Sequence, residues 1–128
     1  TMNEVFNYAK CPICGNVVED INGNTTPLRC CGKPMEILKP NTTEAATEKH
    51  LPVVEVSDGD IFVKVGSVAH PMTKEHYIMW VSQVCDNKEN KVILYPEQDA
   101  VVRFPYMPEC KIYAYCNLHG LWMTEVKL

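Results

Sequence analysis

The residues of this 128-residue chain best suited to chemistry are its four histidines, which all lie at or beyond residue 50. Neutral imidazoles together with a thiolate are the ligands that a borderline transition metal prefers. Cys116 and His119 stand three residues apart, close enough for a tight turn to bring both onto one ion. We therefore expect one metal site built from His50, His70, His76, Cys116 and His119.

Four nitrogens and one sulfur would leave one position of an octahedral ion open. An open position indicates chemistry, because a structural zinc ion is satisfied by four ligands. Zinc bound by a subset of the five groups is the alternative that the spacing leaves open.

A second cluster of metal-binding residues lies near the N-terminus. In Cys11-Pro12-Ile13-Cys14-Gly15 two residues separate the cysteines, so that both sulfurs can face one ion. In Cys30-Cys31-Gly32 adjacent side chains must diverge before they converge on the same ion, which predicts a distorted tetrahedron. A zinc ion that only stabilises the fold and an iron ion that relays electrons are about equally plausible from the ligands alone.

Composition narrows the class of protein. A chain that is 46% hydrophobic can bury a core, but a first part of about 38 residues is too short to fold on apolar burial alone and would need its metal. The formal net charge of −4 and the lack of clustered Lys and Arg argue against a nucleic acid partner.

The cysteine count and the hydrophobic pattern bear on the compartment. Seven cysteines cannot form a complete disulfide framework, and their spacing favours metal binding in a reducing compartment. The sequence opens without a signal-like run and has no apolar stretch near the roughly 20 residues needed to cross a bilayer. We therefore expect a cytoplasmic protein that is not bound to a membrane, with Cys85 and Cys110 as free thiols outside any ligand motif.

The hydrophobic pattern predicts an all-β protein of two domains. Residues 1–38 contain three candidate strands, Val5–Lys10, Asn16–Glu19 and Pro34–Leu38, with a turn at Asn22-Gly23-Asn24. A linker of about residues 39–47 follows, in which Thr43 would cap a short helical turn over residues 44–47.

The second domain, residues 39–128 including that linker, is predicted to be a sandwich of seven strands, the first two joined by a hairpin at Ser57-Asp58-Gly59-Asp60. Strand alternation would put His76 on the same face as Ile78 and Trp80. The predicted strands are Val53–Val56, Ile61–Val65, His76–Val84, Lys91–Tyr95, Ala100–Phe104, Lys111–Cys116 and Leu121–Lys127.

These motifs, in this order, closely resemble desulfoferrodoxin, the two-iron class of superoxide reductase. Cys11-Pro12-Ile13-Cys14-Gly15 and Cys30-Cys31-Gly32-Lys33-Pro34-Met35 resemble the family's desulforedoxin-type module. Three further motifs resemble those of the family's catalytic domain. They are Glu48-Lys49-His50, His70-Pro71-Met72 through His76-Tyr77-Ile78-Met79-Trp80, and Cys116-Asn117-Leu118-His119-Gly120. The resemblance covers essentially the whole chain.

The resemblance implies two iron centres and an immunoglobulin-like catalytic domain. It implies a tetrathiolate iron in the first domain, where zinc could also bind, held by Cys11, Cys14, Cys30 and Cys31. It further implies a catalytic iron with four equatorial imidazoles, an axial Cys116 and a sixth position that is open in the ferrous state. Glu48 would occupy that position after oxidation, and Lys49 would lie near the incoming superoxide.

By the same resemblance the chain would be an enzyme that reduces superoxide to hydrogen peroxide by one electron. Rubredoxin or a flavin reductase would supply electrons, and the chain would form a homodimer. Two other classes compete with this interpretation, a non-enzymatic iron electron carrier and a zinc-binding module. Trp80, Tyr115 and Trp122 are expected to pack around the site rather than to exchange electrons.

Overall fold

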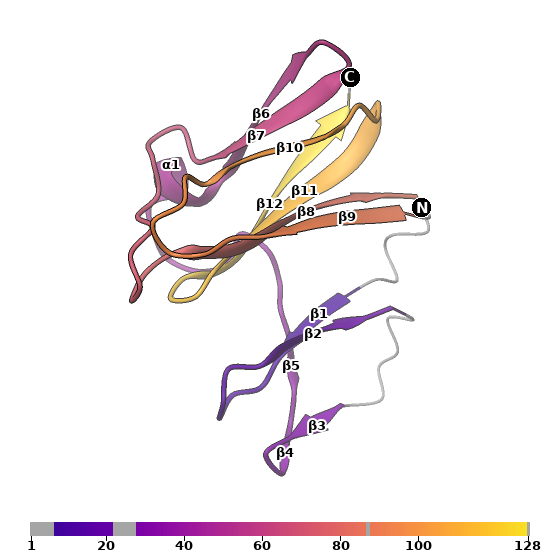
Figure 1. The fold of residues 1–128 in the computed structure, drawn as a ribbon. Helices are drawn as coiled ribbons and strands as arrows, with labels where there is room; N and C mark the ends of the chain where they lie inside the picture. Colours follow the sequence, from indigo (N-terminus) through magenta and orange to yellow (C-terminus); the bar gives the residue numbers. More distant parts are fainter. Residues whose placement is uncertain (1–6, 22–27, 87, 128) are drawn as a thin grey trace. The chain divides into compact units, whose positions relative to one another are not determined.

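The computed structural model describes residues 7–21, 28–86 and 88–127. Its contacts divide the chain into two compact units, residues 1–39 and 40–128, each with its own sheets (Figure 1). The predicted turn at residues 22–24 lies outside the described residues. No helix in the described part is long and apolar enough to cross a membrane.

The described residues of the first unit form five very short strands (Figure 1). Its larger sheet has the order β2-β1-β5, and a separate hairpin joins β3 to β4 across Cys31 and Gly32, which both have positive φ. Two short strands therefore replace the single predicted strand over Pro34–Leu38, and β3 was not predicted. The strands are β1 Asn7–Lys10, β2 Val17–Asp20, β3 Arg29–Cys30, β4 Lys33–Pro34 and β5 Glu36–Ile37.

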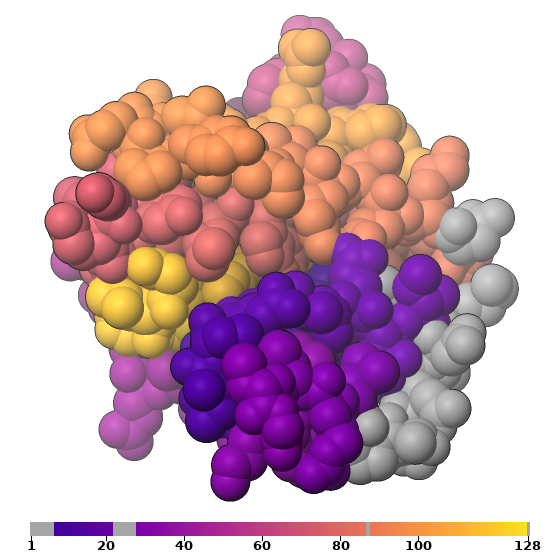
Figure 2. Space-filling view, turned by 60° about the horizontal axis from the view of Figure 1, so that its bottom comes forward, coloured from indigo at the N-terminus to yellow at the C-terminus, as the bar shows by residue number. Residues whose placement is uncertain are grey.

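Very little of this unit is buried. Among its described residues only Tyr8, Ala9 and Cys11 are buried, and the space-filling view shows its indigo and purple residues at the molecular surface (Figure 2). A unit with so small a core cannot offset the conformational entropy lost on folding by apolar burial alone. Its fold is therefore expected to depend on a ligand that ties the cysteines together.

The second unit is a sandwich of two antiparallel sheets with the strand orders β10-β7-β6 and β12-β11-β8-β9 (Figure 1). The predicted all-β class and the seven-stranded sandwich are thus confirmed. The strands are β6 Pro52–Ser57, β7 Asp60–Val65, β8 Ile78–Cys85, β9 Lys88–Ile93, β10 Val101–Pro105, β11 Glu109–Cys116 and β12 Gly120–Lys127.

The core of the sandwich lies between these sheets. Val63 on β7 and Val102 on β10 pack with Val81 on β8 and Ile112 on β11, and all four are buried. The predicted hairpin between β6 and β7 is confirmed: Ser57 pairs with Asp60, and the two residues between them have positive φ as its tight turn requires.

The short helix differs from the expectation. The predicted helical turn over residues 44–47 is instead α1, Thr47–His50, with Ala46 at its N-cap position and no side-chain cap, so Thr43 is not the cap. The shift brings Glu48, Lys49 and His50 into the helical turn itself.

A register shift in the larger sheet overturns one prediction about side-chain direction. Tyr115 pairs with Trp80, but Cys116 pairs with Ile78, so Met79 is an extra residue between these pairs. Because such a bulge breaks the alternation of faces, Ile78 lies in the core cluster while Trp80 stacks on Tyr115 outside it. The prediction that Ile78 and Trp80 share a face is therefore wrong.

The packing of the sandwich predicts the cost of opening a cavity in it. Replacing the fully buried Ile112 by Ala should lower the free energy of unfolding by about 2–5 kcal/mol. Ile93→Ala, at a side chain that is 53% exposed, is the matched control and should change it by about 0.5 kcal/mol or less. Denaturant unfolding at equal metal content measures both, and equal losses would contradict the assigned core.

Candidate metal centres

Four of the five residues expected at the histidine-rich metal site come from chain segments that end at the same edge of the sandwich. Cys116 is the last residue of β11 and pairs with Ile78, the first residue of β8, so His76 just before β8 lies at that edge. His119 lies in the turn that leads into β12 at Gly120. His70 lies in the loop after β7, and His50 ends α1.

The imidazole rings form a closed cycle. Neighbouring ring centroids are 4.6 Å apart for His50–His70, 4.7 Å for His70–His76, 5.0 Å for His76–His119 and 4.9 Å for His119–His50. The interplanar angles of these four pairs lie between 73° and 88°. The diagonal pair His50–His76 is farther apart, at 6.4 Å, and only 30° from parallel. Four rings around a common centre are the arrangement expected of four ligands in one plane.

The distances between ligand atoms agree with that arrangement. His50 Nε2 lies 3.1 Å from both His70 Nε2 and His119 Nδ1. For metal–nitrogen bonds of about 2.1 Å, neighbouring nitrogens are about 3.0 Å apart at right angles and about 3.4 Å apart in a tetrahedron. The observed spacing therefore favours a planar set of nitrogens over a tetrahedral zinc site.

Cys116 completes this group. Its sulfur lies 3.8 Å from His119 Nδ1, and the ligand atoms of Cys116, His50, His70 and His76 all lie within 4.8 Å of one another. The fold thus brings together all five residues expected at this site. His119 presents Nδ1 where His50 and His70 present Nε2, a difference that the sequence did not predict.

Hydrogen bonds outside the cycle determine which nitrogens carry protons. His50 Nδ1 lies 2.8 Å from the carbonyl oxygen of Ala46, and His70 Nδ1 lies 2.6 Å from that of Pro71. Because a carbonyl can only accept, both Nδ1 atoms donate, and in the neutral rings both Nε2 atoms carry lone pairs that face each other. His76 Nε2 is buried and finds no hydrogen-bond partner among the residues that the structure describes. These lone pairs repel unless a cation lies between them, so the residues fit a metal ion.

Burial keeps these imidazoles unprotonated, as binding of a cation requires. Desolvation lowers the pKa of His70 to about 4 and also lowers the pKa values of His50 and His76, so the three rings are neutral near pH 7. Burial raises the pKa of the Cys116 thiol, while the backbone N–H groups of Leu118 and His119 oppose that effect. The same N–H groups would stabilise a metal-bound thiolate.

Trp122 supports two of the ligands. Its ring stacks on His50 with centroids 5.0 Å apart and planes 25° apart, and its indole N–H donates to the carbonyl of His119 over 3.1 Å. The expected packing role thus includes a hydrogen bond that helps to hold the β11–β12 turn. Trp80 and Tyr115 stack on each other instead, with centroids 5.7 Å apart.

Glu48 and Lys49 are exposed on α1 and stand next to His50. The Glu48 carboxylate is not part of the group of ligand atoms within 4.8 Å. Burial is the main cause that lowers the pKa values of His50 and His76, and the charge of Lys49 adds a smaller contribution in the same direction. Their shared peptide is anchored: the carbonyl of Glu48 accepts from Val68 N–H at 2.8 Å and from the Ser67 hydroxyl at 3.2 Å.

Gly66 packs closely against α1, a structural constraint near the site that the sequence analysis missed. A Cβ at this residue would lie 2.6 Å from the carbonyl oxygen of Glu48 and 2.9 Å from the carbonyl carbon of Lys49, closer than packed atoms allow. Only glycine therefore lets the chain after β7 pack against the turn that carries Glu48 and Lys49. Its place directly after a predicted strand was the available signal.

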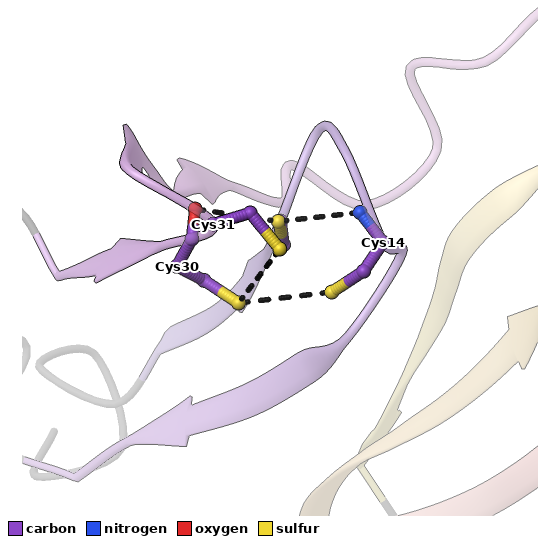
Figure 3. Close-up of side chains that lie close together, drawn as sticks. Cys14, Cys30 and Cys31 are labelled. Carbon is purple, nitrogen blue, oxygen red and sulfur yellow. Dashed lines mark hydrogen bonds between the residues drawn. The ribbon is translucent and has the colours of Figure 1, made fainter.

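The four N-terminal cysteines also come together (Figure 3). Cys14 Sγ lies 3.6 Å from Cys30 Sγ, Cys30 Sγ lies 3.9 Å from Cys31 Sγ, and all four sulfurs, with Cys11, lie within 4.8 Å of one another. Metal–sulfur bonds of about 2.3 Å in a tetrahedron place sulfurs roughly 3.8 Å apart. The cluster therefore fits a tetrahedral ion.

The backbone favours negative charge on this cluster. N–H groups of Ile13 and Cys14 each lie 3.4 Å from Cys11 Sγ, and the bond from Cys14 is the main reason that the pKa of Cys11 falls to about 6. The neighbouring Cys11 sulfur is the main cause that raises the pKa of Cys30 to about 12. Four adjacent sulfurs thus cannot all ionise unless a cation compensates their charge.

The remaining cysteines lie away from both clusters. Cys85 ends β8 and Cys110 lies near the start of β11, at the opposite end of the sheet from Cys116. Both are free and buried, and burial is the main cause that raises the pKa of both thiols, to about 12 for Cys85. They behave as packed apolar side chains.

The lowered pKa of His70 predicts how the stability of the metal-free protein depends on pH. The unfolded chain protonates His70 below about pH 6.5, whereas the folded chain does so only near a pKa of about 4. Because the unfolded state binds more protons in this window, stability should fall as the pH decreases from about 6.5 to about 4. In His70→Gln, which does not titrate, the fall should be smaller. Urea unfolding followed by fluorescence of Trp80 and Trp122 measures the free energy of unfolding at each pH. An identical dependence on pH in the variant and the wild type would contradict the lowered pKa of His70.

Comparison with known proteins gives this chain a family. The family described as Desulfoferrodoxin matches residues 42–125, and the family described as Desulfoferrodoxin, N-terminal domain, matches residues 2–38. The desulfoferrodoxin of Syntrophotalea carbinolica is 46% identical over 97% of this chain and 99% of its own length. A desulfoferrodoxin homolog of Archaeoglobus fulgidus is 41% identical over 96% and 99% of the two chains.

Solved structures agree with this result. The superoxide reductase from Treponema pallidum superposes with a TM-score of 0.74 at 33% identity, covering 93% of this chain and 98% of that one. A one-iron superoxide reductase from Giardia intestinalis covers 63% of this chain and 99% of its own, with a TM-score of 0.56 and 26% identity. Since the family matches span nearly the whole sequence, this chain belongs to the desulfoferrodoxin family.

Proposed function

We propose that this protein is a superoxide reductase, which converts superoxide to hydrogen peroxide by adding one electron and two protons. The observation that carries the proposal is the closed cycle of four imidazoles with Cys116 beside it, because five donors leave one position of an octahedral ion for a substrate. Iron held by these five residues would supply the electron. Relatives named superoxide reductase support the same reaction.

Each side chain around the proposed site has a physical role. Burial lowers the pKa values of His50, His70 and His76, so these imidazoles stay neutral. With imidazoles that bind through a lone pair, the ligand set would carry a single negative charge, on the Cys116 thiolate. That thiolate donates electron density, which favours loss of an electron. The N–H groups of Leu118 and His119 moderate the donation by hydrogen bonding to the sulfur.

In this proposal Lys49 attracts the substrate, and Glu48 acts after the oxidation step. Superoxide is a small anion, so a cationic side chain on an exposed turn beside His50 would raise its local concentration. Glu48 would become a ligand of the oxidised centre. Because the backbone at the Glu48–Lys49 peptide is anchored, only side-chain rotation would be needed for either role.

We propose further that residues 1–38 hold a second iron, on Cys11, Cys14, Cys30 and Cys31, and that residues 39–128 form the catalytic domain. The sulfur spacing supports a tetrahedral ion without selecting iron over zinc, and metal analysis of the purified protein decides between them. Seven free cysteines support a reducing compartment, which we take to be the cytoplasm. A homodimer and an electron donor such as rubredoxin or a flavin reductase complete the proposal, and light scattering and reduction by purified donors test them.

The decisive experiment measures the products. A known amount of superoxide, supplied with an excess of the reduced protein, should yield one hydrogen peroxide per superoxide consumed and no dioxygen. Release of dioxygen would indicate dismutation instead. A protein that leaves superoxide untouched while its metals still change oxidation state would be an electron carrier, and a colourless, redox-silent one would be a zinc-binding module.

The adjacent charges on α1 give a matched pair of variants. Lys49→Ala should slow the second-order reaction with superoxide and weaken its dependence on ionic strength, because it removes an attractive charge. Glu48→Ala should not slow capture, but it should change the visible spectrum of the oxidised protein. Pulse radiolysis and absorption spectroscopy measure these effects. An unchanged rate in the first variant or an unchanged spectrum in the second removes the corresponding role.

A further inference from the structure

We propose that Asn117 is a positioning residue, which holds the ligand His76 in place relative to the ligand Cys116. Its side chain makes one hydrogen bond on each side of His76. Asn117 Oδ1 accepts from Tyr77 N–H over 3.0 Å, and Asn117 Nδ2 donates to the carbonyl of Glu75 over 2.9 Å. Since one partner can only donate and the other can only accept, the orientation of the amide is determined by its neighbours.

The backbone of Asn117 adds a third connection. Its N–H donates to the carbonyl of Tyr77 over 3.2 Å, so a single residue binds both residues that flank His76 in sequence. Asn117 itself follows Cys116 directly. One residue therefore joins the segment that carries an imidazole ligand to the strand end that carries the sulfur ligand.

The place in the fold explains why such a connection is needed. His76 lies before the first residue of β8, and the register shift at Tyr115 and Cys116 interrupts the ladder next to it. The backbone hydrogen bonds of His76 itself are local, to Thr73. Without the side chain of Asn117, the segment before β8 would be tied to β11 through the backbone bond to Tyr77, the Ile78–Cys116 pair and the strand pairs beyond the shift, none of which holds the carbonyl of Glu75.

The His76 ring also lacks the support that other ligands have. His50 and His70 are each oriented by a carbonyl that accepts from Nδ1, whereas in the described part of the chain no such carbonyl holds His76, and its Nε2 has no partner. The position of this ring thus depends on its backbone, which Thr73 holds locally and which Asn117 connects to β11. Outer hydrogen bonds of this kind typically change metal affinity about 10–100-fold.

The inference rests on the proposed function only in taking His76 and Cys116 as metal ligands. The test uses the full-length protein with Co²⁺ in place of its native metals, so that its outcome does not depend on whether the protein reduces superoxide. Asn117→Ala should weaken Co²⁺ binding about 10-fold at the site that His76→Ala also weakens. Its visible spectrum, taken as a difference from wild type, should shift in the same direction as that of His76→Ala. The four-cysteine site is unchanged in each variant, so the absorption of Co²⁺ bound there cancels in the difference spectrum.

Asn90→Ala is the matched control, because it also removes an asparagine side chain that donates a single 2.9 Å bond, here to Gln83, near the other end of the same sheet. This control should leave the Co²⁺ spectrum and affinity unchanged. Hydrogen exchange in the Zn²⁺-loaded protein gives a second measurement: the amide of Tyr77 should exchange faster in Asn117→Ala and not in Asn90→Ala.

The possible outcomes separate the two proposals. Wild-type affinity, spectrum and Tyr77 exchange in Asn117→Ala would overturn the role of Asn117, even if the protein reduces superoxide. A wild-type protein that fails to reduce superoxide would overturn the proposed function and leave the Co²⁺ result standing. If Asn117→Ala does not fold, Asn117→Ser replaces it, because a single hydroxyl cannot bridge both backbone groups and the same shifts are expected.

Discussion

Repulsion between buried lone pairs is the unfavourable interaction that the packed sandwich of the second unit must overcome to hold the ligand cycle together. Two Nε2 atoms 3.1 Å apart, each on a ring whose proton is held by a carbonyl on the far side, are unfavourable neighbours without a cation between them. The sandwich can impose this arrangement because its strands end together at one edge and its core is well packed. Stability of the sheets thus holds the ligands in place for the ion.

The two units use metal in different ways. In the first, only three described residues are buried, so an ion on four cysteines would supply much of the energy of folding. In the second, a core from both sheets exists independently of the ligands, and the ring cycle is formed at its edge. Loss of metal should therefore unfold the first unit more readily than the second, because only the second has an apolar core of its own.

The sequence predicted the residues of both clusters better than it predicted how the chain presents them. Spacing alone grouped Cys116 with His119, and the short strands around them followed from alternating apolar residues. The bulge at Met79 could not be predicted, because register depends on partner strands that a single sequence does not reveal. The displaced α1 and the close approach at Gly66 were missed for the same reason, since both depend on contacts between residues distant in the chain.

Reactive side chains and rigid backbone are combined at α1 in a way that suits a substrate as small as superoxide. A small anion offers few groups to recognise, so specificity must come from charge and from access rather than from shape. The carbonyl of Glu48 is fixed by two donors, while the side chains of Glu48 and Lys49 remain in solvent. A fixed backbone keeps the points of attachment of both charged side chains in place beside His50. In the proposed role of Glu48, rotation of its side chain alone would bring the carboxylate to the oxidised centre, without any movement of the ligands themselves.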